Sequence, residues 1–368
     1  MGNNVQLKDE ITDNIFRIGA KSFWEQGYKG KGVVVAILDT GCNAQHTELN
    51  GRIVGGYNFT NEGTITNYED LNGHGSHVAG TIASSFNDSG IVGVAPEVHL
   101  LILKVLDKRG TGSIDSLVQA IEYAINWTGI NNERVSVISM SLGLKTPKDI
   151  LRNAIKRAIA NDIAVVAAAG NDGDGNYSTV EYAYPAGYDE LISVGAIDNN
   201  NIAFFSNTNK EVDIYAPGVA IKSTGLLDGF VNLSGTSMAV PHVTGALALL
   251  INKYESITKS KPTESKLFEY LMQHTNEVYI SDYGESISVL DLSKNINIEV
   301  DIVPQSEKIL DKTLMLKCFC ETRKSQAFFT QCLNECSTEQ ERHFLISLIQ
   351  ESAARAKYIK ELCESFKR

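Results

Sequence analysis

The stretch VVVAILDTG at residues 33–41 decides the fold of this chain. Its first six residues are apolar and mostly β-branched, which is typical of a strand buried on both faces of a sheet. Similar runs occur at residues 98–104, 135–139 and 163–168, and amphipathic stretches with helical periodicity occur at residues 113–127 and 148–161. Strands that alternate with helices predict an α/β fold, with a doubly wound, mostly parallel sheet and helices on both faces.

The composition excludes several classes of protein. The chain has 368 residues, 43% of them hydrophobic, and a formal net charge of −11. A chain this acidic is a poor candidate for binding nucleic acid or anionic lipid. Its apolar runs are too short to span a bilayer, and the N-terminus lacks the basic and apolar regions of a signal peptide. We therefore expect a cytoplasmic protein with reduced thiols and with no nucleic-acid or membrane partner.

The chain changes character near residue 300. The strand and helix alternation fades after about residue 276, and residues 295–304 resemble a linker or an edge strand. The tail has 11 Lys or Arg against 9 Asp or Glu, a capping-box pattern at residues 337–340 and an apolar helical face from Leu345 to Phe366. We expect an N-terminal extension at residues 1–20, a main domain at 21–300 and a small Cys-containing helical extension at 304–368.

The cysteines of this extension leave two interpretations open. Cys318, Cys320, Cys332 and Cys336 could bind zinc, although their spacing differs from that of common zinc modules. Packing in a helical core is the simpler interpretation, because cysteine is an ordinary buried residue.

Four motifs carry residues suited to catalysis. Asp39 ends a buried strand, where open α/β sheets place active sites, although a turn or helix cap also explains it. His74 begins an apolar stretch; it could equally be a core histidine, or a metal ligand together with His77. Asn171 follows another strand and could donate to an oxyanion, or simply form a turn. Ser237 precedes an apolar helix, as a nucleophile or as a plain N-cap.

The order and the residues of these motifs resemble those of the subtilisin-like serine proteases, peptidase family S8. The motifs are Asp39-Thr40-Gly41, His74-Gly75-Ser76-His77, Gly170-Asn171 and Gly235-Thr236-Ser237-Met238-Ala239 with Pro241. The resemblance extends from about residue 21 to residue 254. Cys42 and the segment 171–175 make it closest to the intracellular subtilisins.

The resemblance implies a subtilisin-like fold and a serine endopeptidase. Ser237 would attack the scissile carbonyl, His74 would act as general base and then acid, and Asp39 would orient His74. Asn171 and the Ser237 N–H would bind the oxyanion.

The resemblance also implies how a protein or peptide substrate binds, as an added extended strand. Two segments would pair with it, namely Gly110, Thr111 and Gly112, and Ser141, Leu142 and Gly143. The pocket for the P1 side chain, which precedes the scissile bond, would have walls at Ala168, Ala169 and Gly170 and a floor near Ala183. Asp172 would lie at its mouth, where a carboxylate favours a basic P1 residue.

Structural Ca²⁺ is common in this family, so we expect a calcium site without assigning its ligands. Glu48 occupies a position where a ligand carboxylate is usual, and the loop at 86–91 contains Asn87 and Asp88. Oxygen ligands suit calcium, but a solvated turn explains the loop equally well.

Several functional alternatives remain at this point. The enzyme could degrade proteins generally, or cleave one precursor or leader peptide as a dedicated maturation protease. A non-catalytic binding protein on the same scaffold, and a metal-dependent hydrolase using His74 and His77, are further alternatives. The C-terminal extension could form a homodimer, dock substrates or target the protein.

Overall fold

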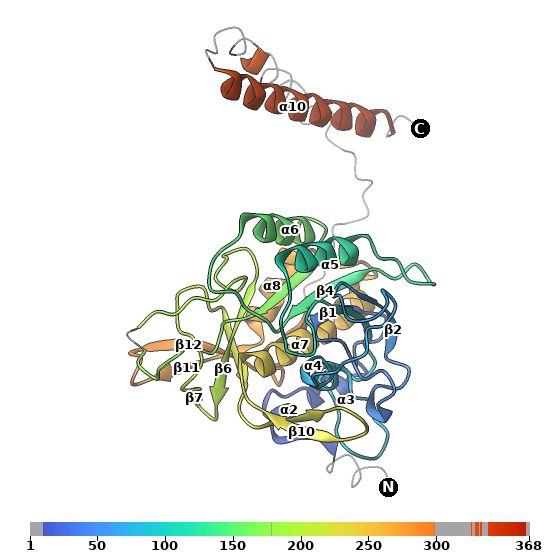
Figure 1. Cartoon of the computed structure of the whole chain (residues 1–368), viewed down its shortest axis with the longest axis vertical. Coiled ribbons are helices and arrows are strands. Elements are labelled where there is room, and N and C mark those ends of the chain that lie inside the picture. The colour runs from blue at the N-terminus through green and yellow to red at the C-terminus, as the bar shows by residue number, and fades with distance from the viewer. Residues whose placement is uncertain are drawn as a thin grey trace. The chain divides into compact units, whose positions relative to one another are not determined.

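A computed structural model describes residues 10–177 and 179–298, and from the C-terminal region residues 325, 328–330, 332 and 338–365. The chain forms two compact units, residues 1–298 and residues 299–368. The first unit contains one large sheet with helices on both sides (Figure 1).

The sheet has ten strands in the order β11-β12-β8-β6-β5-β4-β1-β3-β2, with β7 paired to β6. Every pair from β8 to β2 along this order is parallel, and β11–β12 and β6–β7 are antiparallel. The strands are β1 (Val34–Asp39), β2 (Ile53–Asn58), β3 (His99–Lys104), β4 (Val135–Met140), β5 (Ala164–Ala168), β6 (Ile192–Asp198), β7 (Asn201–Ile202), β8 (Ile214–Pro217), β11 (Thr275–Ile280) and β12 (Glu285–Leu290). The predicted mostly parallel sheet is confirmed. A separate antiparallel hairpin joins β9 (Ile221–Thr224) and β10 (Phe230–Leu233).

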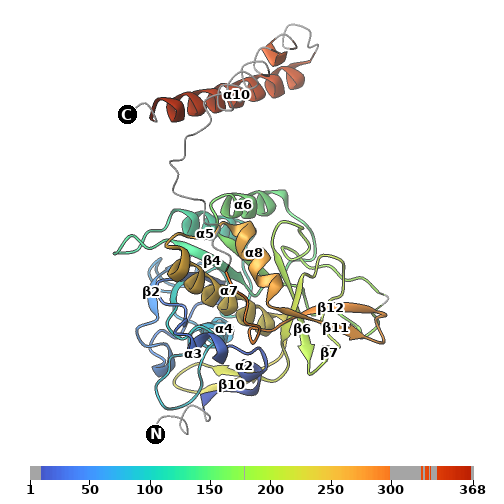
Figure 2. The same cartoon turned by 180° about the vertical axis from the view of Figure 1, so that it is seen from behind.

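Strand β1 shows why both faces of the sheet are covered. Its side chains alternate between two hydrophobic cores, with Val35 and Ile37 in one and Val34, Ala36 and Leu38 in the other. The first core includes α4 (His74–Ala83), α7 (Thr236–Thr258) and α8 (Glu264–Gln273); the second includes α5 (Ile114–Asn126) and α6 (Asp149–Ile159). Figures 1 and 2 show α5 and α6 on the opposite side of the sheet from α4 and α7.

Helices α5 and α6 form where the sequence predicts them. The Ser113 hydroxyl caps α5 by accepting the Ser116 N–H at 3.0 Å. Leu117, Ala120, Ile121 and Ala124 then recur on its buried face, and α6 repeats the spacing with Leu151, Ala154, Ile155 and Ala158.

Residues near the N-terminus pack into the first unit. Helices α2 (Asp13–Arg17) and α3 (Lys21–Glu25) contribute Ile15 and Phe23 to the core, and Ile18, between them, is fully buried. The Ile18 carbonyl also accepts the Leu292 N–H at 2.7 Å. The described N-terminal residues therefore help to form the body that carries β1.

The C-terminal unit contains α10 (Glu339–Ser365). Thr338 and Glu341 form a capping box at its start, with the Glu341 N–H donating to Thr338 Oγ1 and the Thr338 N–H donating to Glu341 Oε2. This pair lies one residue after the predicted pattern at 337–340. Ser337 and the thiols of Cys318, Cys320 and Cys336 lie outside the described residues.

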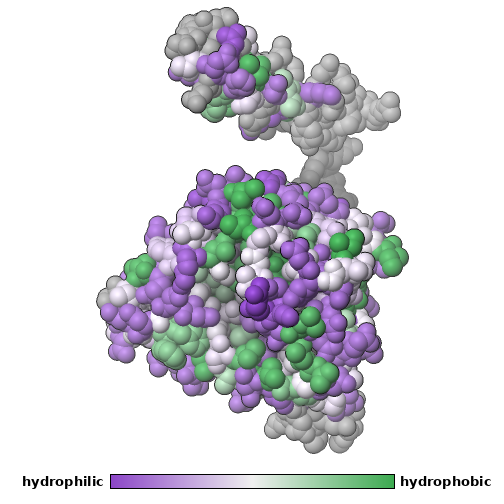
Figure 3. All heavy atoms as spheres, viewed as in Figure 1, coloured by the Kyte–Doolittle hydropathy of each residue, from purple (hydrophilic) through white to green (hydrophobic). Residues whose placement is uncertain are grey.

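Hydrophobic and hydrophilic residues are interspersed on the face of the first unit seen in Figure 3. The two hydrophobic cores lie between the sheet and the helices on its two faces.

Candidate active site

The predicted site residues follow neighbouring parallel strands. Strands β5, β4 and β1 are adjacent, so their carboxyl ends share one edge of the sheet. Asp39 is the last residue of β1, Ser141 directly follows β4, and Asn171 lies three residues after β5.

His74 and Asp39 form a hydrogen-bonded pair at this edge. His74 is the first residue of α4, and its Nδ1 donates to Asp39 Oδ1 at 2.8 Å. The Thr40 N–H donates to the same oxygen at 2.7 Å, and Asp39 is 1% exposed. A Cβ at Gly75 would lie 2.2 Å from the Gly41 carbonyl oxygen, so a glycine is needed for α4 to approach the end of β1 so closely.

The environment of His74 favours its protonated form. Burial by itself lowers the pKa of His74, but the charge of Asp39, its hydrogen bond and the charge of Asp70 outweigh burial and raise the pKa. The hydrogen bond to Asp39 therefore orients the imidazole, and the negative charge of Asp39 stabilises its cationic form.

A second buried carboxylate, Asp70, forms hydrogen bonds with residues next to both Asp39 and His74. Its Oδ1 accepts the Thr40 hydroxyl and the Gly73 N–H, both at 2.9 Å, and its Oδ2 accepts the Ser76 N–H and hydroxyl at 2.8 and 2.7 Å. Burial raises the pKa of Asp70, but bonds from Gly73, Ser76 and Asn72 outweigh it and lower the pKa. Asp70 thus joins the end of β1 to the start of α4.

His77 takes no part in this pair. Its Nε2 bonds to the Ile221 carbonyl oxygen at 2.8 Å, and burial lowers its pKa to about 4. His74 and His77 therefore have different partners. Among the described residues there is no group of three or more His, Cys, Asp or Glu side chains that could hold a metal. This arrangement gives no support to a metal-dependent hydrolase.

Ser237 is the second residue of α7 and is tied to the end of β4. Its hydroxyl donates to the Ser141 carbonyl oxygen at 3.2 Å, and the Ser141 hydroxyl donates to the Ser237 carbonyl oxygen at 2.8 Å. Pro241 has no N–H to bond to that carbonyl four residues earlier, so the Ser141 hydroxyl supplies the missing donor. The nucleophile candidate is thereby fixed at a helix N-terminus, which favours negative charge.

The Asn171 side-chain amide has a defined orientation. Its Oδ1 accepts the Thr236 N–H at 2.8 Å and the Thr236 hydroxyl at 2.9 Å. A backbone N–H can only donate, so the atom that accepts it must be oxygen. The Nδ2 group is then the part of the amide left for a ligand in the adjoining pocket.

A cavity of about 190 Å³ lies between the segments that follow β4 and β5. Its lining contains Asn171, Ser237 and six of the predicted substrate-binding residues, namely Leu142, Gly143, Ala168, Gly170, Asp172 and Ala183. Ser141 and Ala169 do not line it: Ser141 bonds to Ser237, and Ala169 donates its N–H to Val194. Leu144, Lys145 and Thr236 also line it and were not predicted.

The predicted segment Gly110, Thr111 and Gly112 forms an exposed turn outside this cavity. The Asp107 N–H donates to the Thr111 carbonyl, and Gly112 pairs with Leu106 in an isolated bridge. Gly110 has a φ of 73°, which suits glycine.

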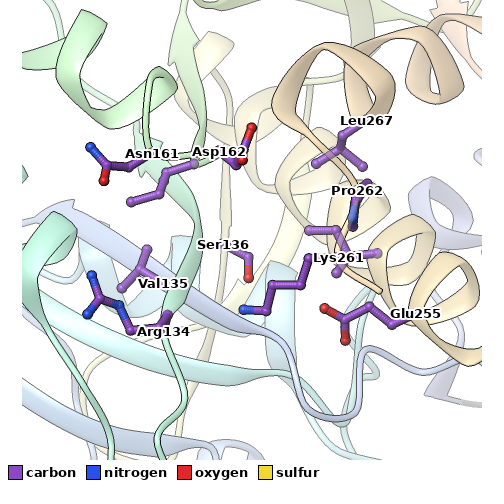
Figure 4. Close-up of a pocket in the computed structure, with 11 residues that line it drawn as sticks. Arg134, Val135, Ser136, Asn161, Asp162, Glu255, Lys261, Pro262 and Leu267 are labelled. Carbon is purple, nitrogen blue, oxygen red and sulfur yellow. The ribbon is translucent and has the colours of Figure 1, made fainter. Parts of the chain in front are cut away.

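A larger cavity, of about 280 Å³, lies at the opposite ends of β4 and β5 (Figure 4). Val135 begins β4 and Ile163 precedes β5, so this cavity is at the sheet edge away from Asp39 and Ser237. Its lining includes Arg134 and Lys261 and none of the predicted site residues. The smaller cavity is therefore the one placed for the chemistry.

The predicted calcium region contains two buried carboxylates. Glu48 and Glu10 are 1% and 3% exposed, and Glu10 Oε1 has no hydrogen-bond partner. Burial raises the pKa of Glu48 to about 7, although the hydrogen bond donated by Asn87 at 3.1 Å lowers it. A Cβ at Gly90 would lie 2.1 Å from Glu48 Oε1, so the loop at 86–91 closes directly on the carboxylate. These oxygens fit a hard cation such as Ca²⁺.

The fold and site together have the arrangement of a serine hydrolase: an Asp–His pair, a serine at a helix N-terminus and an oriented amide, all at one edge of a parallel sheet. Comparison with known proteins makes the assignment more specific. A family model described as the subtilase family matches residues 30–296, and the chain therefore belongs to this family. It is a subtilisin-like serine endopeptidase, and its substrates are proteins or peptides.

Three relatives show the extent of the similarity. An intracellular serine protease of Paenibacillus polymyxa is 48% identical over 275 residues, which are 73% of this chain and 82% of that protein. The major intracellular serine protease of Bacillus subtilis (strain 168) is 44% identical over 278 residues, 74% of this chain and 85% of that protein. Subtilisin E from the same strain is 43% identical over 258 residues, 70% of this chain and 65% of that protein.

No described helix is both long and apolar enough to cross a membrane. The C-terminal unit lies outside the matched family region.

The sequence analysis missed Asp70, Thr236 and Lys145. Asp70 stands in Asp-Leu-Asn-Gly, which predicts only a turn. Thr236 could have been suspected from its place beside Ser237, but its bond to Asn171 spans 65 residues. Lys145 has no local signal, because it reaches the cavity only when the segment after β4 packs against Ala183 and its neighbours.

Proposed function

We propose that Asp39, His74, Ser237 and Asn171 are the residues that hydrolyse peptide bonds. Ser237 attacks the scissile carbonyl, His74 accepts its proton and passes it to the leaving amine, and Asp39 holds His74 in position. Asn171 Nδ2 and the Ser237 N–H bind the oxyanion. The observation that carries the proposal is the 2.8 Å bond from His74 Nδ1 to the buried Asp39, because it leaves Nε2 as the basic nitrogen.

One movement is needed before the reaction. The Ser237 hydroxyl bonds to the Ser141 carbonyl rather than to His74 in the described structure. Catalytic hydrogen bonds are often long or misaligned without substrate. Rotation of the Ser237 side chain on substrate binding would transfer its donor bond to His74.

Labelling of Ser237 tests this proposal. The wild type should react with a serine-directed fluorophosphonate, and mass spectrometry should place the label on Ser237. Ser237→Ala should lose both the label and peptide hydrolysis, whereas Ser234→Ala, which changes a hydroxyl that caps the Ala220 N–H, should keep them. An unlabelled, folded wild type would favour the non-catalytic binding protein instead.

We infer that the substrate binds as an extended strand between residues 110–112 and 141–143. Support comes from the cavity beside Ser237, which can hold the P1 side chain while the flanking backbone pairs with these segments. Leu142 and Gly143 line that cavity and also belong to one of the segments.

General turnover and dedicated maturation differ in the number of sites cleaved. A peptide library derived from a proteome, treated with the wild type and with Ser237→Ala, separates them by mass spectrometry. Many varied cuts made only by the wild type would indicate general degradation. A few cuts that share an extended motif would indicate a dedicated maturation protease. We favour general turnover in the cytoplasm, because two relatives are named intracellular serine proteases.

We also propose a structural calcium ion held by Glu48 together with Glu10 and oxygens of the loop at 86–91. The support is the pair of buried carboxylates and the unpartnered Glu10 Oε1. The ion would neutralise these carboxylates and fix the loop; it takes no part in peptide hydrolysis.

We propose that the main domain, residues 21–300, carries the catalysis and that the extension at 304–368 serves another role, such as homodimer formation. The family match ends at residue 296, which supports this division. Sedimentation of the full chain and of a chain ending at residue 298 tests the homodimer. Equal sedimentation as monomers would contradict it.

A further inference from the structure

We propose that the ion pair between Lys145 and Asp172 controls the charge preference of the P1 pocket, so that the enzyme prefers a neutral P1 residue. This inference rests on the proposed function, because it concerns the substrate class of the same site. It replaces the expectation that Asp172 by itself favours a basic P1 residue.

The two side chains lie on opposite walls of the cavity beside Ser237. Lys145 belongs to the segment after β4, and Asp172 directly follows Asn171 after β5; both line the cavity. Lys145 Nζ forms an ion pair with the Asp172 carboxylate. They are the charged residues among the described lining, so together they set its local charge.

The backbone of each wall is anchored. Leu144 exchanges two hydrogen bonds with Tyr184, its N–H donating at 2.6 Å and its carbonyl accepting at 2.8 Å. On the other wall, Asn207 Oδ1 accepts the Asp172 N–H at 2.7 Å, and Asn207 Nδ2 donates to the Ala169 carbonyl at 2.8 Å. Both Cα positions are therefore held beside the cavity, independently of the contact between the two charged groups.

The charged groups themselves remain accessible to a substrate. The Lys145 and Asp172 side chains are 75% and 46% exposed. An exposed pair is held weakly, so an entering side chain can compete for either partner. Both groups line the cavity proposed to hold the P1 side chain, so their screened charges can act on it.

Because of the ion pair, peptides with a basic P1 residue and peptides with an acidic P1 residue should be cleaved with nearly equal efficiency. A basic P1 side chain must displace Lys145 from Asp172, and an acidic one must displace Asp172 from Lys145. A neutral side chain needs neither displacement and meets an otherwise uncharged lining that includes Leu142, Ala168 and Ala183. With either partner removed, the remaining charge is free to select the opposite charge on the substrate.

A set of four proteins tests this inference: the wild type, Lys145→Gln, Asp172→Asn and the double variant. Each would be assayed with three peptides that differ only in P1, which is Leu, Lys or Glu, and kcat/KM measured at low and high salt. The wild type should cleave the Leu peptide best and the Lys and Glu peptides about equally. Lys145→Gln should raise the Lys-to-Glu ratio by about fivefold, and Asp172→Asn should lower it by about as much.

The double variant should return the ratio close to the wild-type value, and high salt should shrink every change. Lys266→Gln, which breaks an exposed lysine pair with Glu269 outside the cavity, is the matched control and should leave the ratio unchanged. A ratio in Lys145→Gln equal to that of the wild type, or a wild type that strongly prefers Lys over Glu, would overturn the inference.

Failure of the proposed function would look different. The wild type would then cleave none of the peptides, whatever their P1 residue. Binding of the same three peptides to Ser237→Ala and to its Lys145→Gln double variant gives the Lys-to-Glu ratio without turnover. The same shift in binding would support the inference, and equal ratios would overturn it.

Discussion

Asn171 is the residue whose role is most sharply defined by its neighbours. Thr236 holds its Oδ1 with two hydrogen bonds, which presents Nδ2 to the cavity beside Ser237. Asn171→Ala should lower kcat by about 100- to 1000-fold with little change in KM, because the donor acts on charge that develops in the transition state. Steady-state kinetics measures this. Thr236→Val, which keeps the backbone donor, should cost less; a loss confined to KM would contradict the assignment.

Asp70 should act on His74 through its charge. Asp70 is a lowered-pKa carboxylate and therefore ionised at neutral pH, where it raises the pKa of His74. Catalysis needs neutral His74, so kcat/KM falls as pH drops through that pKa. Asp70→Asn removes the negative charge, so the pKa of His74 should fall and activity should persist to lower pH.

The pH dependence of kcat/KM distinguishes this electrostatic effect from simple loss of structure. Ser76→Ala removes one hydrogen bond to Asp70 but keeps the charge of Asp70. The acidic pH at which kcat/KM falls should therefore stay unchanged in Ser76→Ala. If kcat/KM of Asp70→Asn falls at the same acidic pH as in the wild type and is lowered equally at every pH, then Asp70 has only a structural role.

At the scale of elements, the start of α7 depends on a bond from another strand. Pro241 removes the helical donor for the Ser237 carbonyl, and Ser141, after β4, replaces it. Ser141→Ala should lower the free energy of unfolding by about 1–3 kcal/mol, because that carbonyl loses its partner in a buried site. Denaturant unfolding in a Ser237→Ala background, which avoids self-digestion, measures the change.

A second substitution provides the control for this element. Pro241→Ala restores an N–H four residues after Ser237, so the double variant should regain part of the stability lost in Ser141→Ala. Equal unfolding free energies for Ser141→Ala with and without Pro241→Ala would show that the Ser141 hydroxyl acts elsewhere.

At the scale of the whole molecule, calcium should stabilise the catalytic unit. Binding to the native state alone adds about 2.7 kcal/mol at a concentration 100-fold above the dissociation constant. For a unit of this size that raises Tm by about 5 °C. Calorimetry of the Ser237→Ala protein with calcium and with a chelator measures the shift. Glu48→Gln should abolish most of it, whereas Asp115→Asn, at the start of α5, should keep it; an equal shift in both variants would place the ion elsewhere.

The layered fold and the positions of β1, β3, β4, β5, α5 and α6 could be predicted from the sequence, because apolar periodicity is local information. Residues 33–38 alternate between two cores, and Leu117 to Ala124 repeat at helical spacing. The four motifs also made Asp39, His74, Asn171 and Ser237 the candidate catalytic residues, because their order along the chain resembles that of a known family.

The contacts of these residues follow from the tertiary structure. The Ser141–Ser237 bonds span 96 residues, the Thr236–Asn171 bonds span 65, and the Asp70 bonds join two separate elements. Lys145 and Asp172 meet because the segments after the neighbouring strands β4 and β5 lie side by side, and Asp172 is therefore paired rather than isolated. Such contacts depend on the packing of whole elements, and no local pattern in the chain records them.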